Sequence, residues 1–390
     1  MKVCIATGAY TPYSKGGGEV SAQQLAEGLA ERGVDVVVLT IGPDEINERI
    51  NGIRVIRFTS FNIYWGTVES ENKGLLKKAA WHLLESYNFR IKLKLDDFFK
   101  NENPDILHVR NITDMSPYLW KVASKRGVKV ISTLNNYACI CVKTSMFRNH
   151  KNCHSLCLPC KITSFPKRYL SNFVDGVISV SLFTLEKHKQ LGFFKNAICK
   201  VIYTGLPSKF QELPVIQSNF LSLGWIGRID ETKGVYELIQ AFSSLNSDSV
   251  LYIAGIGEPE YVEKCKAIAS SKVVFLDYIK SEEFYKLVDI VIINSLWNEP
   301  FPRVLIESYS NGRPVLTTNR GGTREMVKTN ETGFVFDPDK DSLQDELSKL
   351  EQLDLSDLKS MRKNIAKFIT GLSAEMIEQH IKFYHEILDA

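Results

Sequence analysis

With 390 residues, 44% of them hydrophobic and 24% charged, the chain is long enough for two globular domains with substantial cores. No run of about 18 apolar residues occurs, which argues against a membrane-spanning helix and favours a cytoplasmic protein. Residues 1–200 contain 28 Lys and Arg against 17 Asp and Glu, and the rest of the chain contains 20 against 28, so the first half is basic.

Strands and helices alternate along the first half of the chain. Apolar runs predict buried strands at 2–7, 34–40, 105–109, 128–133 and 176–180. Residues 19–32 repeat apolar side chains at helical spacing, so a helix should follow the first strand. Residues 211–220 contain Pro214 and show little periodicity, which indicates a linker.

The second half repeats this alternation, with strands predicted at 221–226, 250–254, 273–276, 290–294, 314–318 and 333–336. The pattern predicts an α/β protein with two doubly wound, Rossmann-like domains that face a central cleft, with ligands at the carboxyl ends of the strands. We expect domains over 1–207 and 208–372, a cysteine-rich insertion at about 139–161, and a C-terminal helix over 373–390 that returns to the first domain.

Two glutamates eight positions apart, Glu299 and Glu307, flank the predicted start of a helix. Pro302 suits the first position of that helix, which places Glu299 in the preceding loop and Glu307 about a turn and a half inside. A helix N-terminus has unpaired N–H groups and a positive dipole end, which together bind anions. Two carboxylates beside such a site suit a ligand with phosphates and hydroxyls, such as a nucleotide sugar.

Two further segments follow predicted strands. Residues 227–234 contain Arg228 and Lys233, and two cations at a strand end suit a diphosphate leaving group. Solvated surface residues are the alternative for this pair. The three glycines at 16–18 precede the first helix, where they would let a ligand approach the backbone, although a flexible turn explains them equally well.

Together these three segments, in this order and spacing, resemble the retaining glycosyltransferases of family 4, which have the GT-B fold. The resemblance extends over nearly the whole chain and includes residues 178–181 and the glycine pair at 321–322. It implies transfer of a hexose-type sugar, with retention of configuration, from a UDP-, GDP- or ADP-sugar to a glycan or polyprenyl-linked acceptor. Such a reaction would serve the synthesis of a cell-surface polysaccharide such as capsule or lipopolysaccharide. It would require no cofactor and no catalytic metal.

The resemblance also implies roles for single residues. Arg228 and Lys233 would bind the donor diphosphate, Glu307 the ribose hydroxyls and Glu299 the hydroxyls of the donor sugar. The expected catalytic residues are Glu299, Arg228, Lys233 and Asn135. Other donor-binding positions would be Gly17 and Gly18 at the β-phosphate, the backbone at Phe301, Pro302, Arg303 and Val304, and, near the base, Gly257, Glu258, Tyr278 and Ile279.

Asn135 departs from the family pattern, because many relatives have a histidine at this place near the sugar. An amide donates and accepts hydrogen bonds but cannot titrate. Asn135 then only orients the sugar, or the acceptor is activated in another way, or activity is impaired. A front-face attack, in which the departing phosphate takes the acceptor proton, would need no histidine. His108 and Asn136 are further candidates on the acceptor side, and a structural role for His108 is equally open.

Five of the eight cysteines crowd into residues 139–160. In a cytosolic chain such a cluster favours a structural zinc site over disulfides, with four thiolates from Cys141, Cys153, Cys157 and Cys160. A cysteine-rich loop without metal is the alternative. Because the cluster follows Asn135 closely, we expect it to border the acceptor side of the site.

Residues 73–94 are apolar, aromatic and basic together, a composition typical of a helix that lies on an anionic membrane. We therefore expect peripheral contact with the inner face of the membrane. A helix packed on the sheet, with a solvated basic face, is the alternative. No nucleic-acid-binding module is recognisable, so nucleic acid is not an expected partner.

Two rival functions are compatible with the same fold. A nucleotide-sugar epimerase would need titratable acid and base residues, and Asn135 does not favour it. A catalytically inactive partner that binds nucleotide sugars is the other rival, and Asn135 is its only support. The intact set of Glu299, Glu307, Arg228 and Lys233 argues against that second rival.

Overall fold

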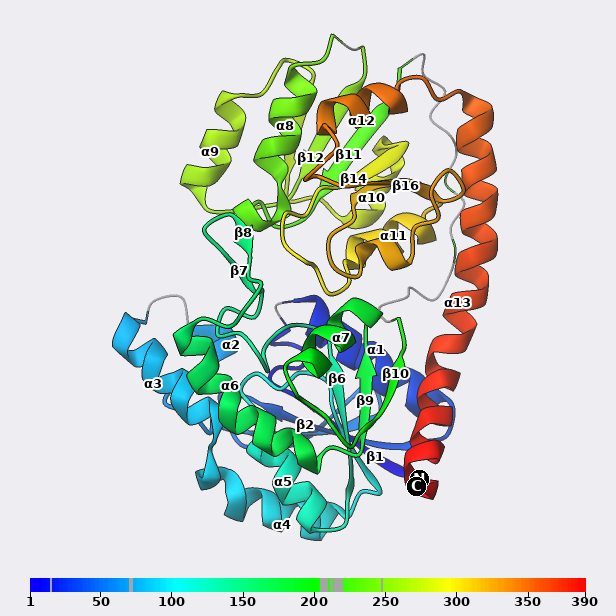
Figure 1. Ribbon diagram of the computed structural model, residues 1–390. Helices are drawn as coiled ribbons and strands as arrows, with labels where there is room; N and C mark the ends of the chain where they lie inside the picture. The colour runs from blue at the N-terminus through cyan, green and yellow to red at the C-terminus, as the bar shows by residue number, and fades with distance from the viewer. Residues whose placement is uncertain (15, 70–72, 204–209, 211–212, 214–219, 247) are drawn as a thin grey trace. The chain divides into compact units, whose positions relative to one another are not determined.

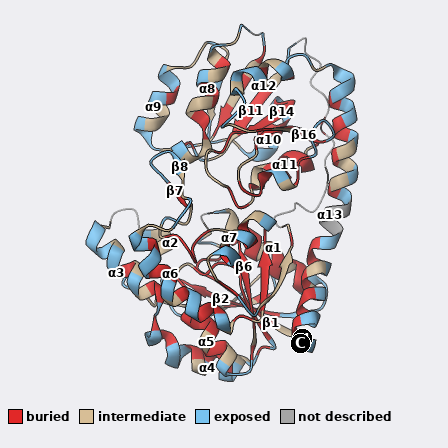
Figure 2. Ribbon diagram, in the orientation of Figure 1, coloured by how far each residue is buried: buried red, intermediate tan, exposed pale blue. Residues whose placement is uncertain are grey.

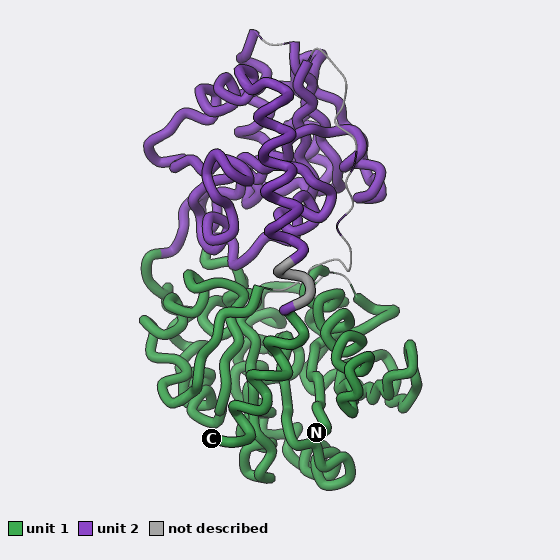
Figure 3. Tube along the Cα trace, turned by 90° about the vertical axis from the view of Figure 1, so that its right-hand side faces the viewer, with its two compact units in different colours: residues 1–146, 154–205, 376–390 green, residues 147–153, 206–375 purple. Residues whose placement is uncertain are grey.

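The computed structural model describes residues 1–14, 16–69, 73–203, 210, 213, 220–246 and 248–390, without the side chains of 371–374. The chain divides into two compact units (Figure 3). The first contains residues 1–146, 154–205 and 376–390, and the second contains residues 147–153 and 206–375. Each unit has a parallel sheet of its own, which agrees with the predicted fold class.

The first unit is built on an eight-stranded sheet with the strand order β10-β9-β6-β5-β1-β2-β4-β3 (Figure 1). Neighbouring strands run parallel, except that β3 and β4 form an antiparallel hairpin. The strands are β1 (Lys2–Thr7), β2 (Asp35–Ile41), β3 (Ile46–Ile50), β4 (Ile53–Phe58), β5 (Ile106–Val109), β6 (Lys129–Leu134), β9 (Gly176–Ser179) and β10 (Ile198–Val201).

Helices cover this sheet, and Figure 2 shows the strands buried and the helices exposed on their outer sides. The helices are α1 (Gly17–Glu31), α2 (Gly66–Glu69), α3 (Leu75–Ser86), α4 (Lys92–Glu102), α5 (Tyr118–Lys125), α6 (Leu158–Leu170) and α7 (Leu182–Gln190), with 3-10 turns at Phe89–Ile91 and Ser171–Phe173. The central strand β1 is buried from Val3 to Thr7, as expected for a strand covered on both faces.

The β3–β4 hairpin is an element that the sequence analysis missed. Its turn is Asn51-Gly52, with φ angles of 49° and 82°, the left-handed pair of a two-residue hairpin turn. β3 lies at the edge of the sheet and its residues are mostly exposed, so it has no apolar run to mark it. The Asn-Gly pair was the available signal.

The second unit has a six-stranded parallel sheet in the order β13-β12-β11-β14-β15-β16. Its strands are β11 (Ser222–Ile226), β12 (Val250–Ala254), β13 (Val273–Asp277), β14 (Ile290–Ile293), β15 (Val315–Thr318) and β16 (Gly333–Phe336). Its helices are α8 (Val235–Ser243), α9 (Pro259–Ala267), α10 (Ser281–Leu287), α11 (Arg303–Ser310) and α12 (Leu343–Leu350), with 3-10 turns η3 (Glu231–Lys233) and η4 (Thr323–Glu325). Apolar side chains of β11, β12, β14, α8 and α12 form its core.

The last helix, α13, runs over Leu355–Asp389, so it begins 18 residues before the predicted start at 373. Its final part belongs to the first unit, where Ile377 lies against Gly28 of α1 and Ile387 against Gly176 of β9. A Cβ atom at either glycine would lie less than 3.0 Å from these isoleucines, so the close packing depends on glycine there.

Residues 147–153 are a second departure from the predicted boundaries. They form a short antiparallel hairpin, β7 (Phe147–Arg148) and β8 (Lys151–Asn152), and they belong to the second unit. The sequence analysis placed the whole cysteine-rich insertion in the first domain. Sequence position alone cannot reveal such an exchange, because it is decided by side-chain contacts of Asn152 with the second unit.

Candidate functional site

The strand order of the second unit changes direction between β11 and β14. The chain passes from β11 outward to β12 and β13, and then returns to the other side of β11 as β14. In open parallel sheets, ligands bind beyond the carboxyl ends of the strands at such a switch point. The loops that leave these two strand ends are residues 227–234 and residues 294–302, and both contain predicted site residues.

Lys233 and Glu299 meet at this switch point. The Lys233 Nζ lies 2.6 Å from the Glu299 Oε1, and the Ser295 hydroxyl donates to the other carboxylate oxygen, Oε2, at 2.6 Å. Glu299 is buried, whereas a quarter of the Lys233 side chain is exposed and lies over the Trp297 ring. Within this ion pair, Glu299 is therefore shielded from solvent and Lys233 is accessible to a ligand.

Hydrogen bonds to backbone carbonyls hold the two loops together. The Asn294 side chain donates to the Gly234 carbonyl at 2.9 Å, and the Leu296 N–H donates to the Thr232 carbonyl at 2.9 Å. Gly234 has a φ of 66°, and a Cβ atom there would lie 2.0 Å from the Asn294 carbonyl oxygen. Only glycine fits at this position, which is one reason for the pair of glycines that flank the segment 227–234.

A third loop, after β15, closes on Glu299 from the other side. The Gly322 N–H donates to the Glu299 carbonyl at 2.8 Å. Gly321 has a φ of 62°, and a Cβ atom there would lie 2.1 Å from the same carbonyl oxygen. The glycine pair at 321–322 thus has a packing role beside Glu299 that the sequence analysis did not identify.

The hairpin residue Asn152 supports the same loop. Its side-chain Nδ2 donates to the Leu296 carbonyl at 2.9 Å, and its Oδ1 accepts from the Asn298 N–H at 2.7 Å. Both bonds fall on the segment that leads into Glu299. Asn152, Asn294 and Ser295 are the supporting residues that sequence reasoning missed; for the latter two, their place directly after β14 was a usable signal.

Glu307 lies in α11, which begins at Arg303 with Pro302 as its N-cap and without a side-chain cap. The Glu307 carboxylate pairs with Arg303 at 3.1 Å, and burial raises its pKa while Arg303 opposes that rise. Among the described residues, no hydrogen bond or ion pair joins Glu307 to Glu299 or Lys233. The predicted glutamate pair therefore flanks an uncapped helix N-terminus, which is exposed to an anion.

Arg228 is not joined to this cluster in the structure. Its side chain is 74% exposed and its guanidinium pairs with Asp230 of the same loop. Gly257 lies where a Cβ atom would be 2.0 Å from the Ile229 carbonyl, and Glu258 is the N-cap residue of α9. Tyr278 is 78% exposed and Ile279 is half-buried. These predicted positions all lie on loops after β11, β12 and β13.

In the first unit, Gly17 begins α1 and Gly18 lies beside Asn135. A Cβ atom at Gly18 would be 3.3 Å from the Asn135 Nδ2, which donates to the Arg110 carbonyl at 3.0 Å. Asn136 accepts a hydrogen bond from the Ala138 N–H and shapes the turn that follows. The glycine loop and the predicted acceptor-side amide are thus brought together at one end of this sheet.

His108 is fully buried. Its Nδ1 lies 2.7 Å from the Tyr384 hydroxyl of α13, and its Nε2 lies 2.7 Å from the Thr133 hydroxyl of β6. Burial and the nearby Arg110 charge hold the pKa of His108 well below its usual range. The imidazole is therefore a neutral link between the sheet and the last helix, which favours the structural alternative over a place on the acceptor side.

Of the four predicted zinc ligands, Cys141 and Cys157 each contact the Cys160 thiol. Cys141, Cys157 and Cys160 belong to the first unit and Cys153 to the second. Contacts with the Cys160 thiol and with the backbone at 143, 145 and 146 lower the pKa of Cys141 to about 6. Within the described residues, no three His, Cys, Asp or Glu side chains are arranged to hold a metal ion. The zinc site stays a prediction: elemental analysis should find about one zinc per chain, and a trace would contradict it.

Within the described part of the chain, each helix is too short or too polar to cross a bilayer. This finding concerns membrane-spanning helices alone.

Comparisons with known proteins point to one family. The family model described as Glycosyltransferase Family 4 matches residues 15–210, and the model described as Glycosyl transferases group 1 matches residues 214–368. The chain is 32% identical over 332 residues to an uncharacterized 42.6 kDa protein in the cps region of Klebsiella pneumoniae, covering 84% of this chain and 88% of that protein.

Two further matches differ in extent. The capsular polysaccharide biosynthesis glycosyltransferase CapM of Staphylococcus aureus is 28% identical over 140 residues, which cover 34% of this chain and 36% of that protein. The crystal structure of Anabaena HepE in complex with UDP-glucose matches with a TM-score of 0.67 at 17% identity, over 100% of this chain and 99% of that one. The structural likeness shows the GT-B type of fold, with two Rossmann-like units.

Proposed function

Because the chain belongs to the family 4 glycosyltransferases with the GT-B fold, we propose that it transfers a hexose-type sugar from a nucleotide-sugar donor, with retention of configuration. The proposed acceptor is a glycan or a polyprenyl-linked saccharide, and the product a cell-surface polysaccharide. The names of CapM and of the cps-region protein support the polysaccharide. The UDP-glucose bound to HepE supports a UDP-sugar among the UDP-, GDP- and ADP-sugar donors.

The cluster of Lys233, Glu299 and Ser295 carries this proposal. A lysine ammonium has three donor hydrogens, and among the described residues Glu299 takes one of them, which leaves capacity for phosphate oxygens. A carboxylate has about four acceptor positions, and Glu299 uses two, one for Lys233 and one for Ser295. The remaining capacity suits the hydroxyls of a donor sugar.

The proposed reaction uses this charge arrangement. Cleavage of the bond between the sugar C1 and the phosphate oxygen leaves negative charge on the diphosphate, which Lys233 and the uncapped N-terminus of α11 would stabilise. The acceptor hydroxyl oxygen forms the new bond to C1 on the same face, and its proton passes to the departing phosphate. Asn135 would orient the sugar through hydrogen bonds, and no titrating histidine is needed.

A donor panel tests the proposal. The purified protein is incubated with UDP-, GDP- and ADP-sugars, each with a polyprenyl-diphosphate-linked saccharide, and products are analysed by mass spectrometry and NMR. We expect one donor to be consumed and one sugar to be added with its anomeric configuration retained. Isomerised donor without transfer would identify the epimerase alternative, and nucleotide binding without turnover would identify an inactive binding protein.

We also propose that the first unit contacts the inner face of an anionic membrane. Four residues of α6, at spacings of four, three and four, form one exposed apolar stripe: Leu158, Ile162, Phe165 and Tyr169, each 51% to 69% exposed. Lys161 and Arg168 flank it, and α3, which contacts α6, exposes Leu75 and Leu76 at its start. Apolar side chains with adjacent cations suit the surface of an anionic bilayer.

Vesicle sedimentation tests this contact. We expect binding to vesicles of phosphatidylglycerol and phosphatidylcholine, weaker binding to pure phosphatidylcholine, and loss of binding in the double variant Ile162→Ser, Phe165→Ser. The exposed residue Tyr278 of the second unit provides a control, because Tyr278→Ser should bind like the unaltered protein. Equal binding of the double variant would reject the α6 stripe as the contact.

A further inference from the structure

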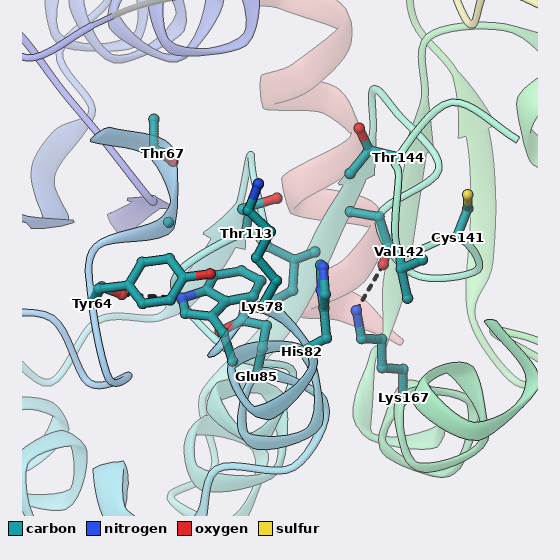
Figure 4. Close-up of a pocket in the computed structure, with 14 residues that line it drawn as sticks. Tyr64, Thr67, Lys78, His82, Glu85, Thr113, Cys141, Val142, Thr144 and Lys167 are labelled. Atoms are coloured by element: carbon teal, nitrogen blue, oxygen red, sulfur yellow. Dashed lines mark hydrogen bonds between the residues drawn. The ribbon is translucent and has the colours of Figure 1, made fainter. Parts of the chain in front are cut away.

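A cavity of about 270 Å³ lies inside the first unit, and its lining includes Cys141, which the sequence analysis selected as a candidate zinc ligand. One wall is the side of α3 that bears Lys78, Trp81, His82 and Glu85, and another is Lys167 of α6 (Figure 4). A third wall comes from residues 138–144, the segment that follows Asn135 and Asn136. The cavity is therefore built next to the predicted acceptor side.

Lys167 is the least expected residue of this cavity. Its side chain is 7% exposed, and its Nζ donates to the Ala138 carbonyl at 2.8 Å. Among the described residues, no carboxylate lies within ion-pair distance of this ammonium. A buried charge without a counter-ion is costly, so a protein keeps one mainly where a ligand supplies the opposite charge.

A second cation reaches the same cavity from α3. Lys78 is half-buried, and within the described part of the chain its side chain forms no ion pair. Figure 4 shows Lys78 and His82 of α3 on the side of the cavity that faces Lys167. Two ammonium groups thus line one small space, and among the described residues neither is ion-paired with a carboxylate.

The two ammonium groups outweigh the other titratable groups of the cavity at neutral pH, although the Cys141 thiol, whose pKa is lowered, also lines it. Burial, with a smaller contribution from Asp114, raises the pKa of Glu85 to about 8, so this carboxyl is mostly protonated at pH 7. Burial and the nearby Lys167 lower the pKa of His82 to about 4, so the imidazole is neutral. Glu85 accepts hydrogen bonds from the Ser116 N–H and from Asn62.

An aromatic surface forms part of the cavity wall. The rings of Tyr64 and Trp81 stack with a centroid separation of 5.9 Å, and the Trp81 indole N–H donates to the Tyr64 carbonyl at 3.0 Å. This bond fixes the orientation of the indole. A rigid aromatic face suits the C–H face of a sugar ring, and the volume is below the roughly 300–1,000 Å³ of sites for drug-sized ligands, so it suits one sugar residue.

We propose that this cavity binds an acidic sugar residue, with its carboxylate or phosphate held by Lys78 and Lys167 and its ring against Trp81. The assignment of this sugar to the acceptor rests on the proposed function. The anion has two possible sources with the same chemistry, which are a uronic acid of a glycan and the phosphate that joins a sugar to its carrier.

Binding measurements without a donor test the proposal independently of transfer. Calorimetric titrations use glucuronic acid, glucose 1-phosphate, glucose and inorganic phosphate. We expect the two acidic sugars to bind at least about tenfold more tightly than glucose, because two charge-assisted contacts are lost with the neutral sugar. Tighter binding of glucuronic acid identifies a glycan residue, and tighter binding of glucose 1-phosphate identifies a sugar joined to a carrier. Equal binding of glucose, or of inorganic phosphate alone, would overturn the proposal.

Two variants and a matched control locate the site. Lys167→Met and Lys78→Met should each weaken binding of the acidic sugar about tenfold or more, without affecting glucose. Lys161→Met, on the exposed side of the same helix α6, should bind normally. Lys78 is half-buried, so its variant should fold even if Lys167→Met does not. Normal binding by Lys78→Met would refute the site.

The outcome also separates this proposal from the proposed function. Lys233→Met should slow transfer by about 10² to 10³ while leaving binding of the acidic sugar unchanged. Intact binding without transfer in the unaltered protein would reject the enzyme and keep the cavity. Transfer to a neutral acceptor with no binding of acidic sugars would reject the cavity and keep the enzyme.

Discussion

The Lys233 ammonium lies 2.6 Å from the Glu299 carboxylate, although the two residues are 66 positions apart in the chain. The contact joins the loop after β11 to the loop after β14, at the point where the strand order of the second unit changes direction. It places one cation and one carboxylate, both singled out from sequence motifs, in a single local site.

Replacing Lys233 tests its proposed place at the leaving group. Lys233→Met should lower kcat/KM for sugar transfer by about 10² to 10³, the usual cost of removing a group that stabilises developing charge. The control is Lys286→Met, because Lys286 is also ion-paired to a glutamate, Glu283, but is exposed on α10. Steady-state kinetics with the preferred donor measure both. Similar losses in the two variants would contradict a specific role for Lys233.

Glycine at 234 should be irreplaceable for packing as well as for backbone conformation. Gly234→Ala adds a Cβ atom 2.0 Å from the Asn294 carbonyl at a φ of 66°, and should destabilise the protein by about 2 kcal/mol or more. Gly33→Ala is the control, since Gly33 has a φ of 77° but nothing within 4 Å, so only the conformational cost of about 1 kcal/mol applies. Urea unfolding compares them, and equal losses would exclude the clash.

Asn152 should act as a positioning residue for the loop that carries Glu299. Asn152→Ala removes two hydrogen bonds to that loop, so affinity for the donor nucleotide should fall by about tenfold. Asn364→Ala removes a single bond from a half-buried asparagine to the Glu331 carbonyl and serves as the control. Calorimetry with UDP, and with the preferred nucleotide if it differs, gives the affinities. Unchanged affinity of Asn152→Ala would show that the hairpin does not support the loop.

Ionisation of Glu85 should make stability depend on pH. The pKa of Glu85 is about 8 in the folded protein and near the ordinary glutamate value of 4.5 when unfolded, so the folded state holds the proton more strongly. The contribution of Glu85 to stability is present in full below pH 4.5 and is lost as pH rises from there through 8. Lys167 and Asp114 are the charged groups that act on this carboxyl.

The matched variant is Glu85→Gln, which keeps the shape but cannot ionise. Its free energy of unfolding, relative to the unaltered protein, should increase between about pH 4.5 and 8 and stay constant above. Denaturant unfolding across this range measures the difference. A difference that does not change with pH would show that Glu85 is charged in the folded protein.

The family and the α/β fold class could be predicted because both depend on local patterns. Apolar runs separated by helical periods identified β1, β2, β5, β6 and β9 of the first sheet and all six strands of the second, but not β4 or β10. Three short motifs indicated the family, which the family models confirm. The β3–β4 hairpin was missed, since an exposed edge strand such as β3 has no buried face to impose a pattern. The early start of α13 was missed as well.

The site residues too were predicted well where local patterns sufficed and poorly where distant contacts decided. Lys233 and Glu299 were selected because of their residue types after strand ends, and the fold brings them together. Arg228 was selected by the same argument, yet its guanidinium pairs with Asp230. Nothing local to His108 distinguishes a reactive from a structural imidazole, because its partners Tyr384 and Thr133 are 276 and 25 residues away.

The sequence by itself determined most of the buried strands, where glycines and prolines interrupt them, and which charged residues stand at strand ends, since these depend on neighbours along the chain. Only the tertiary structure decided that Asn152 supports the loop before Glu299, and that Lys78 and Lys167 line one cavity. Those relationships depend on distances between residues far apart in the chain, and on burial, which changes the charge of a group such as Glu85.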